Sequence, residues 1–215
     1  MASDVTLPKG FVLDPPPNTT LPEGFTLDPP PEDDSSALEN FGKGVLKGTR
    51  KIVDVGAGRS MLLPSMLANG YENLTHVEWS EAASQYLQSK LGGKASGIKW
   101  FIVDLFDWQP GEAIDLWHDR AVFHFQTDAE SISNYLRVLH QSVRPGGYAL
   151  LSTFHLDGPE KCSGLPVMRY DASSLLATLK SYDGSGWEEI NNTVWSHYSP
   201  SGVEQKFQYI LVQNK

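Results

Sequence analysis

The sequence predicts a doubly wound α/β domain with a mainly parallel, seven-stranded sheet and an antiparallel hairpin at its C-terminal end. Short runs rich in β-branched and aromatic residues alternate with stretches of helical periodicity. A glycine-rich turn, Gly56-Ala-Gly58, directly follows the first of these runs, and two strand-like runs close the chain. Strands that alternate with helices favour a parallel sheet with helices on both faces.

The first half of the domain alternates strand and helix from the glycine turn onward. Lys51–Val55 is a short β-branched run, typical of a buried strand, and a helical stretch follows over 60–69. We expect a second strand at 74–78, and Ser80 beside Glu81 is typical of the N-cap of a helix that runs to Leu91. Further strands are expected at 98–103 and 114–118.

The second half adds two helices and three strands. In the helix expected over 128–143, one face is apolar, formed by Ile132, Tyr135, Leu136, Leu139 and Val143. Arg144–Gly147 should end that helix before a fifth strand at 148–154. A helix at 171–181 precedes two final strands, near 187–197 and 203–213, that flank a turn at 199–202.

The N-terminal residues differ from the rest in composition. The segment Leu7–Pro17 returns as Leu21–Pro31, and residues 1–34 hold eight of the 14 prolines. Proline triplets favour polyproline II, so residues 1–36 are predicted to be a disordered acidic tail and 37–215 the folded domain. The alternative is a strap that docks a protein partner through its repeated apolar residues, which are Phe11, Leu13, Phe25 and Leu27.

Charge and composition exclude several classes of protein. Of the net charge of −9, residues 1–34 contribute −6, so the body of the chain has no basic field that would attract nucleic acid. No apolar run is long enough to cross a membrane, and no secretory signal opens the chain. With its single cysteine, the sequence predicts a cytoplasmic protein without disulfides, and no cysteine–histidine spacing indicates a metal site.

The glycine turn carries the strongest functional signal. Glycines after a strand let the backbone approach a ligand, and the following helix presents its amides there. Asp54 lies inside the strand, two residues before Gly56. Glu78 ends the second strand, where a carboxylate is placed to accept hydrogen bonds from ribose hydroxyls. In such sheets, the ligand binds at the carboxyl ends of the strands.

Taken together, these motifs resemble the class I S-adenosylmethionine-dependent methyltransferases. The match comprises Asp54-Val-Gly56-Ala-Gly58, an acid at 78, Asp104 after the third strand, Asp115–His124 around the fourth, and Arg144–Gly147 before the fifth. The resemblance covers about residues 45–213 and implies S-adenosyl-L-methionine as the cofactor.

The resemblance also implies roles for single residues. Gly56, Ala57 and Gly58 would contact the methionyl part and ribose, and Glu78 the ribose hydroxyls. Trp79 would lie against adenine, with Asp104 accepting from its amino group and the Leu105 amide facing the ring. Asp54 would order the loop from beneath, and His118 with Asp119 would lie beside the sulfonium.

A nicotinamide-binding Rossmann domain is the main rival. That fold needs a third small residue in Gly-x-Gly-x-x-Gly, where this chain has Met61. Asp54 also stands where the rival usually has an apolar residue. The sequence therefore favours the methyltransferase.

The methyl acceptor is expected after the fourth and fifth strands. Candidate catalytic residues there are Asp119, Arg120, His124 and His155, and the loop 157–170 is expected to cover the acceptor. Such a polar cluster under a short loop favours a small polar molecule. A lysine side chain of a protein is the alternative acceptor, and a cofactor-binding scaffold without turnover is the third hypothesis.

Overall fold

The computed structural model describes residues 51–182, 186–198 and 204–215. The proline-rich repeat and the predicted domain boundary between residues 36 and 37 lie outside the described residues. No helix among the described residues is long and apolar enough to cross a membrane.

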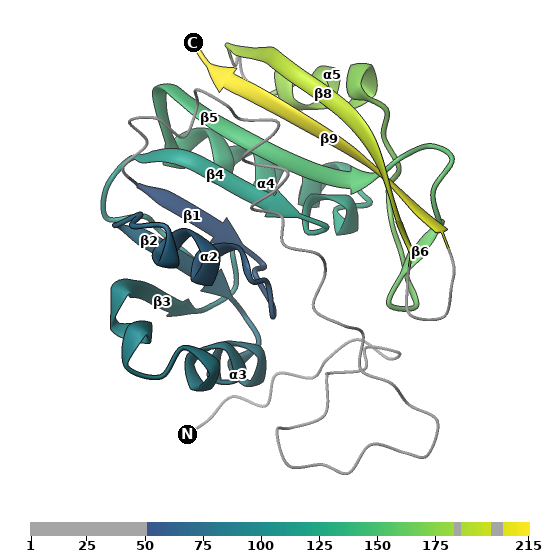
Figure 1. Cartoon of the computed structure of the whole chain (residues 1–215). Coiled ribbons are helices and arrows are strands. Elements are labelled where there is room, and N and C mark those ends of the chain that lie inside the picture. The colour runs from purple at the N-terminus through teal and green to yellow at the C-terminus, as the bar shows by residue number, and fades with distance from the viewer. Residues whose placement is uncertain (1–50, 183–185, 199–203) are drawn as a thin grey trace, which may run out of the picture.

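A seven-stranded sheet forms the centre of the described structure, in the order β3-β2-β1-β4-β5-β9-β8 (Figure 1). Its strands are β1 (Ile52–Val55), β2 (Leu74–Glu78), β3 (Ile98–Ile102), β4 (Ile114–Arg120), β5 (Val143–Phe154), β8 (Trp187–Tyr198) and β9 (Glu204–Asn214). The first five pair in parallel, whereas β9 pairs antiparallel with β5 and with β8. The predicted fold class is therefore confirmed.

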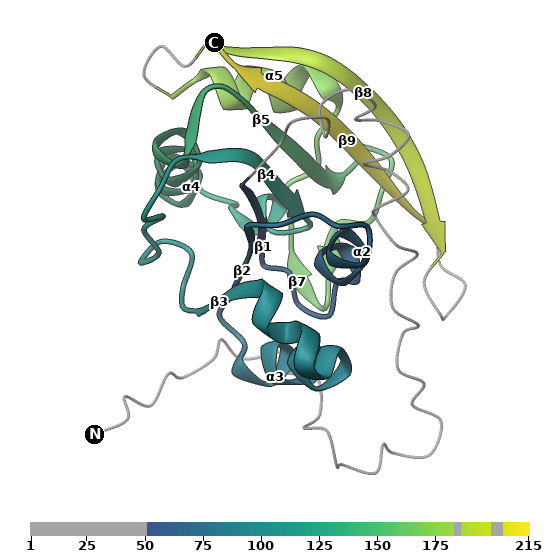
Figure 2. The same ribbon diagram turned by 60° about the vertical axis from the view of Figure 1, so that its left-hand side comes forward.

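Helices cover both faces of this sheet (Figure 2). They are α2 (Leu62–Ala68), α3 (Glu81–Leu91), α4 (Ala129–Ser142) and α5 (Ala172–Lys180), with short 3₁₀ turns η1 (Gly92–Gly97) and η2 (Phe123–Phe125). Ser80 caps α3 as predicted, since its hydroxyl accepts from the Ala83 amide at 3.2 Å. Asp128 and Asp171 cap α4 and α5 with reciprocal side-chain and backbone hydrogen bonds.

Alternate residues of each strand enter two separate cores. Val53, Val55 and Trp117 pack with residues of α4 and α5 on one face. Ile52 and Leu116 pack with residues of α2 on the other. Because successive strand side chains point to opposite faces, neighbouring residues of one strand reach different environments. This alternation separates the predicted site residues.

Two features differ from the sequence prediction. The segment Arg144–Gly147 lies within β5 rather than between a helix and a strand, because Val143 already pairs with Ile114 and the register then shifts. Gly146 takes a positive φ of 75° inside this irregularity. In addition, the loop after β5 contains a small hairpin, β6 (Lys161–Cys162) with β7 (Leu165–Pro166). The predicted turn at 199–202 lies outside the described residues.

Candidate active site

A pocket of about 690 Å³ opens at the carboxyl ends of the parallel strands. Strand order reverses between β1 and β4, which is where doubly wound sheets bind ligands. The pocket is lined from four strand ends, the loop before α4 and the β6–β7 hairpin, by Gly56, Gly58, Val77, Glu78, Trp79, Val103, Asp104, Leu105, Phe106, Ala121, Val122, Phe125, Gln126, Thr127, Cys162, Ser163, Leu165 and Pro166.

The glycine turn after β1 forms one wall of this pocket. Gly56 and Gly58 both have positive φ, 55° and 52°, which side chains other than hydrogen rarely allow. The Gly56 amide donates to the Val77 carbonyl at 2.8 Å, so the turn is anchored to β2. Ala57 is buried and does not line the pocket.

Glu78 lies beside the turn as predicted, at the end of β2. Its Oε2 accepts from the Gly58 amide at 2.9 Å, and its Oε1 accepts from the Ser80 amide at 2.8 Å. Burial raises the pKa of this carboxyl, while the hydrogen bonds from Ser80 and Gly58 act in the opposite direction. The carboxylate is thus oriented by backbone amides with its remaining lone pairs available at the pocket wall.

Trp79, Asp104 and Leu105 all line the same pocket. The Trp79 side chain is 41% exposed, a large flat surface for a pocket residue. Asp104 is exposed, and its Oδ1 accepts from the Phe106 amide at 2.8 Å, which holds the loop after β3. The structure therefore brings these residues together with the glycine turn and Glu78.

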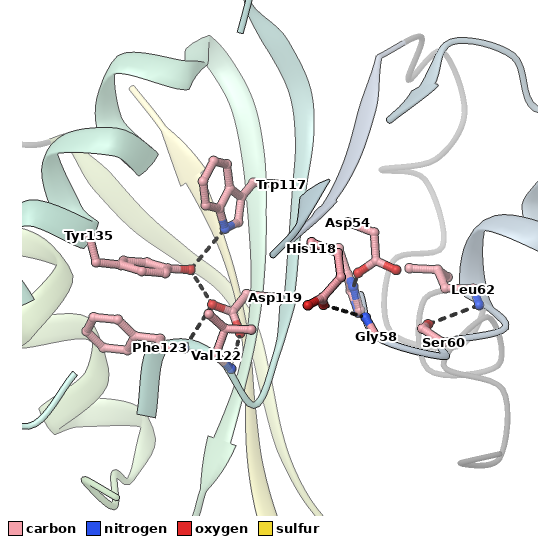
Figure 3. Close-up of polar contacts among 11 residues, drawn as sticks. Asp54, Gly58, Ser60, Leu62, Trp117, His118, Asp119, Val122, Phe123 and Tyr135 are labelled. Atoms are coloured by element: carbon pink, nitrogen blue, oxygen red, sulfur yellow. Dashed lines mark hydrogen bonds and ion pairs between the residues drawn. The ribbon is translucent and has the colours of Figure 1, made fainter. Parts of the chain in front are cut away.

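Asp54 and His118 form a buried pair that joins β1 to β4. Nδ1 of His118 lies 2.7 Å from Oδ1 of Asp54, and both side chains are at most 2% exposed (Figure 3). The two residues are in register across the strands, and His76 is in register with Asp54 on β2. Neither member of the pair lines the pocket. This placement fits the predicted ordering role of Asp54 but does not support the predicted contact of His118 with the sulfonium.

Asp119 points to the opposite face of the sheet from His118 (Figure 3). The side chain is fully buried and does not line the pocket. Its oxygens accept from the Val122 amide at 2.9 Å, the Phe123 amide at 3.0 Å and the Tyr135 hydroxyl. Because the carboxylate is buried outside the pocket lining and bound to these donors, the geometry does not support the predicted contact between Asp119 and a methyl acceptor.

The other candidate catalytic residues are also absent from the described pocket lining, which includes neither Arg120, His124 nor His155. His124 is fully buried, and its Nδ1 accepts from the Phe154 amide at 3.3 Å. Burial lowers its pKa to about 4. His155 accepts from the Asp157 amide at 3.2 Å in the loop after β5. The polar cluster expected from the sequence is therefore not assembled in one place.

Instead, the side of the pocket opposite the glycine turn and Glu78 is lined by residues that the sequence did not single out. They are Val122, Phe125, Gln126 and Thr127 from the loop before α4, with Ser163, Leu165 and Pro166 from the hairpin. The hairpin belongs to the loop 157–170 that was expected to cover the acceptor. Arg169 braces it, donating to the Leu156 carbonyl at 2.9 Å and the Gly158 carbonyl at 3.1 Å.

The pocket fits the cofactor that the sequence resemblance implies. Its volume lies within the range of about 300–1,000 Å³ that is usual for small-molecule sites. It combines a flat indole, a buried carboxylate held by amides and a side-chain-free glycine turn, as an adenosine with a polar tail requires. Among the described residues no group of histidine, cysteine, aspartate and glutamate is arranged to hold a metal ion.

Comparisons with known proteins identify the type of domain. Residues 53–151 match the family model of a methyltransferase domain. No curated protein sequence matches the chain. An S-adenosylmethionine-dependent methyltransferase from Mesorhizobium loti is 17% identical, with a TM-score of 0.63 over 84% of this chain and 99% of that one.

Two further solved structures share the fold. The N-methyltransferase NodS from Bradyrhizobium japonicum, in complex with S-adenosyl-L-homocysteine, is 13% identical, with a TM-score of 0.62 over 85% of this chain and 89% of that one. The 1,6-didemethyltoxoflavin-N1-methyltransferase from Burkholderia thailandensis is 17% identical, with a TM-score of 0.60 over 85% and 86%. Residues 53–151, the part that matches the methyltransferase-domain model, contain the glycine turn and the four strand ends that border the pocket. This match and the shared fold support a class I S-adenosylmethionine-dependent methyltransferase, with S-adenosylmethionine as the cofactor.

Proposed function

We propose that this enzyme transfers the methyl group to a small molecule with a largely apolar body, bound between the loop before α4 and the β6–β7 hairpin. The composition of that end of the pocket carries the proposal. Phe125, Leu165 and Pro166 supply apolar walls, and the polar groups beside them are uncharged: Gln126, Thr127 and Ser163. Apolar walls with a few orienting polar groups are typical of small-molecule sites.

For the cofactor, the predicted contacts remain our proposal. Glu78 would accept from the ribose hydroxyls, since its two bonds to amides leave lone pairs available. Trp79 would lie against the adenine ring, and Asp104 with the Leu105 amide would recognise the ring edge. The glycine turn would contact the methionyl part. When bound, the cofactor supplies an electrophilic methyl group on a sulfonium.

The protein itself would then contribute by aligning the acceptor atom with the methyl group and by excluding water from the pocket. Among the described residues that line the pocket, the acids are Glu78 and Asp104, and no histidine, lysine or arginine is present. Burial also raises the pKa of the Cys162 thiol, so it stays protonated at neutral pH. We therefore propose that the acceptor atom needs no deprotonation by the enzyme. Catalysis would then come from holding that atom in line with the methyl group and the sulfonium of the cofactor.

This composition makes a lysine acceptor the weaker hypothesis. A lysine ammonium would need a carboxylate or another base close to the methyl group. Asp119, the candidate for that role, instead binds Val122, Phe123 and Tyr135 on the other face of the sheet.

The test follows the methyl group from labelled S-adenosylmethionine into extracts separated by size. We expect label in the low-molecular-mass fraction, and recovery of label in protein would contradict the proposal. A Leu165→Arg variant places a charge on the proposed acceptor wall. It should lose turnover while binding S-adenosylhomocysteine normally, and Leu156→Arg, an exposed position outside the described pocket lining, is the matched control.

A further inference from the structure

A buried hydrogen-bond network connects α4 to the turn that follows β4. Trp117 Nε1 donates to the Tyr135 hydroxyl at 3.0 Å, and that hydroxyl donates to Oδ2 of Asp119. Oδ1 of Asp119 accepts from the Val122 amide at 2.9 Å, and Oδ2 also accepts from the Phe123 amide at 3.0 Å (Figure 3). One carboxylate therefore holds two consecutive amides of the turn.

This turn is a strained stretch of backbone that borders the pocket. Ala121 has a φ of 64°, which an alanine adopts only when its surroundings hold it there. Its amide donates to the Ser152 carbonyl at 2.8 Å. The residues that follow line the pocket, including Val122, Phe125 and Gln126.

Val122 connects this turn to the glycine turn after β1 by direct packing. Its side chain packs so closely on Gly56 that a Cβ at that position would overlap with Cγ2 of Val122. Both residues line the pocket. The amide of Val122 is the one that Oδ1 of Asp119 binds, so the carboxylate controls the wall against which the glycine turn rests.

A carboxylate is an expensive way to stabilise the fold at this position. The side chain has no exposed surface, and burial raises its pKa to about 6, with the Tyr135, Val122 and Phe123 hydrogen bonds and the nearby His118 acting in the opposite direction. Because folding raises this pKa from 3.8 to about 6, stability falls as the pH rises from about 3.8, and the loss is complete above about 6. The negative charge of Asp119 therefore does not stabilise the fold. What the carboxylate does provide is the geometry of the turn, through its hydrogen bonds to the Val122 and Phe123 amides.

We propose that Asp119 is a positioning residue for the cofactor site, which holds Val122 against Gly56 by binding the Val122 and Phe123 amides. The residue contacts neither cofactor nor acceptor. An asparagine has the same shape but only one acceptor oxygen, and its amide group would oppose one of the donors. In Asp119→Asn, the side chain can therefore no longer accept from the Val122 and Phe123 amides through two separate oxygens, and the buried charge is lost as well.

The experiment compares Asp119→Asn with Tyr135→Phe at pH 8, measuring S-adenosylhomocysteine affinity by calorimetry and the melting temperature of each variant. Asp119→Asn should weaken binding by about tenfold, while its melting temperature should fall no further than that of Tyr135→Phe, because removal of the buried charge offsets the amide left without an acceptor. Tyr135→Phe keeps both amide bonds but strands the Trp117 donor, so it should lower the melting temperature and bind normally. Ser142→Ala, which removes a buried hydroxyl of α4 outside the described pocket lining, is the control for α4 and should bind normally.

Two results would overturn the proposal. Wild-type affinity for S-adenosylhomocysteine in Asp119→Asn would show that the hydrogen bonds from the turn to Asp119 do not affect cofactor binding. A parallel loss of affinity and melting temperature in both variants would reduce Asp119 to a structural residue. Binding of S-adenosylhomocysteine needs no acceptor, so this outcome does not depend on the proposed acceptor class.

Discussion

The side chain of Val122 occupies the space that a Cβ of Gly56 would take. The two residues come from different strand ends, after β4 and after β1, and they meet at the point where strand order reverses. Each therefore limits the other: Gly56 must lack a side chain, and Val122 must be held in place. The contact joins the glycine turn, the proposed cofactor wall of the pocket, to the loop before α4, the proposed acceptor side.

Replacement of Gly56 by alanine should prevent cofactor binding. An alanine at φ 55° costs about 1–2 kcal/mol, and its methyl group would also displace Val122. We expect measurable folding by urea titration but no calorimetric signal with S-adenosylhomocysteine. Gly111→Ala, where a Cβ meets open space, should bind normally, and equal binding by both variants would contradict this account of the turn.

Replacement of Glu78 by glutamine should weaken binding by about 1.5–3 kcal/mol, the usual effect of losing hydrogen bonds to a charged group. A glutamine offers one oxygen where the Gly58 and Ser80 amides now use two, and it lacks the charge for ribose hydroxyls. The measurement is the S-adenosylhomocysteine dissociation constant. Glu81→Gln, an exposed acid three residues further along the chain, is the control, and unchanged affinity in Glu78→Gln would refute the ribose assignment.

Replacement of Trp79 by alanine tests the adenine contact. Stacking of a nucleobase on an aromatic side chain contributes about 1–3 kcal/mol, so affinity for S-adenosylhomocysteine should fall by that amount. Trp195→Ala is a matched control, because Trp195 is even more exposed, at 61%, and is not among the described residues of the pocket lining. Tryptophan fluorescence is a second measurement of the same contact. The change on addition of S-adenosylhomocysteine should be retained in Trp195→Ala and diminished in Trp79→Ala.

His124 should make stability depend on pH. Burial lowers its pKa from 6.5 to about 4, so the folded state binds fewer protons than the unfolded state between these values. Its contribution is present above pH 6.5 and is lost as the pH falls toward 4, a change of about 3 kcal/mol in total. The free energy of unfolding in urea should therefore fall less between pH 7 and pH 5 in His124→Gln than in the wild type.

The control for that pH series is His155→Gln, which changes a partly exposed ring outside the core. It should retain the wild-type loss of stability between pH 7 and pH 5. If His124→Gln lost as much stability between pH 7 and pH 5 as the wild type, the pH dependence would belong to other groups. The first candidate is the buried His76, whose pKa is also lowered to about 4.

Local signals in the chain were sufficient for most of the fold and for the strand ends that line one side of the pocket. The strand Leu74–Glu78 was predicted with its observed bounds, and Ser80 caps the following helix as expected. Gly56, Glu78 and Asp104 all line the pocket, because each stands at the carboxyl end of a parallel strand and those ends meet at one edge. Strand periodicity alone did not locate the β6–β7 hairpin, whose strands are two residues long.

The acceptor side could not be predicted in the same way. His118 and Asp119 are adjacent in the sequence and were expected together at the sulfonium, yet the alternation of a strand sends them to opposite faces. Phe125 and Leu165 carry no recognisable motif, and they reach the pocket because a turn and a hairpin fold over it.

By itself, the sequence determined the doubly wound fold, the edge of the sheet where the pocket opens and the residues that end its strands there. These follow from periodicity and from glycine and carboxylate positions, which are local properties of the chain. Only the tertiary structure decided that Asp119 binds the amides of a turn, that Val122 packs on Gly56 and that the pocket wall proposed for the acceptor is uncharged. Those outcomes depend on contacts between separate elements, such as Gly56 after β1 with Val122 after β4 and Asp119 of β4 with Tyr135 of α4, and no local pattern encodes them.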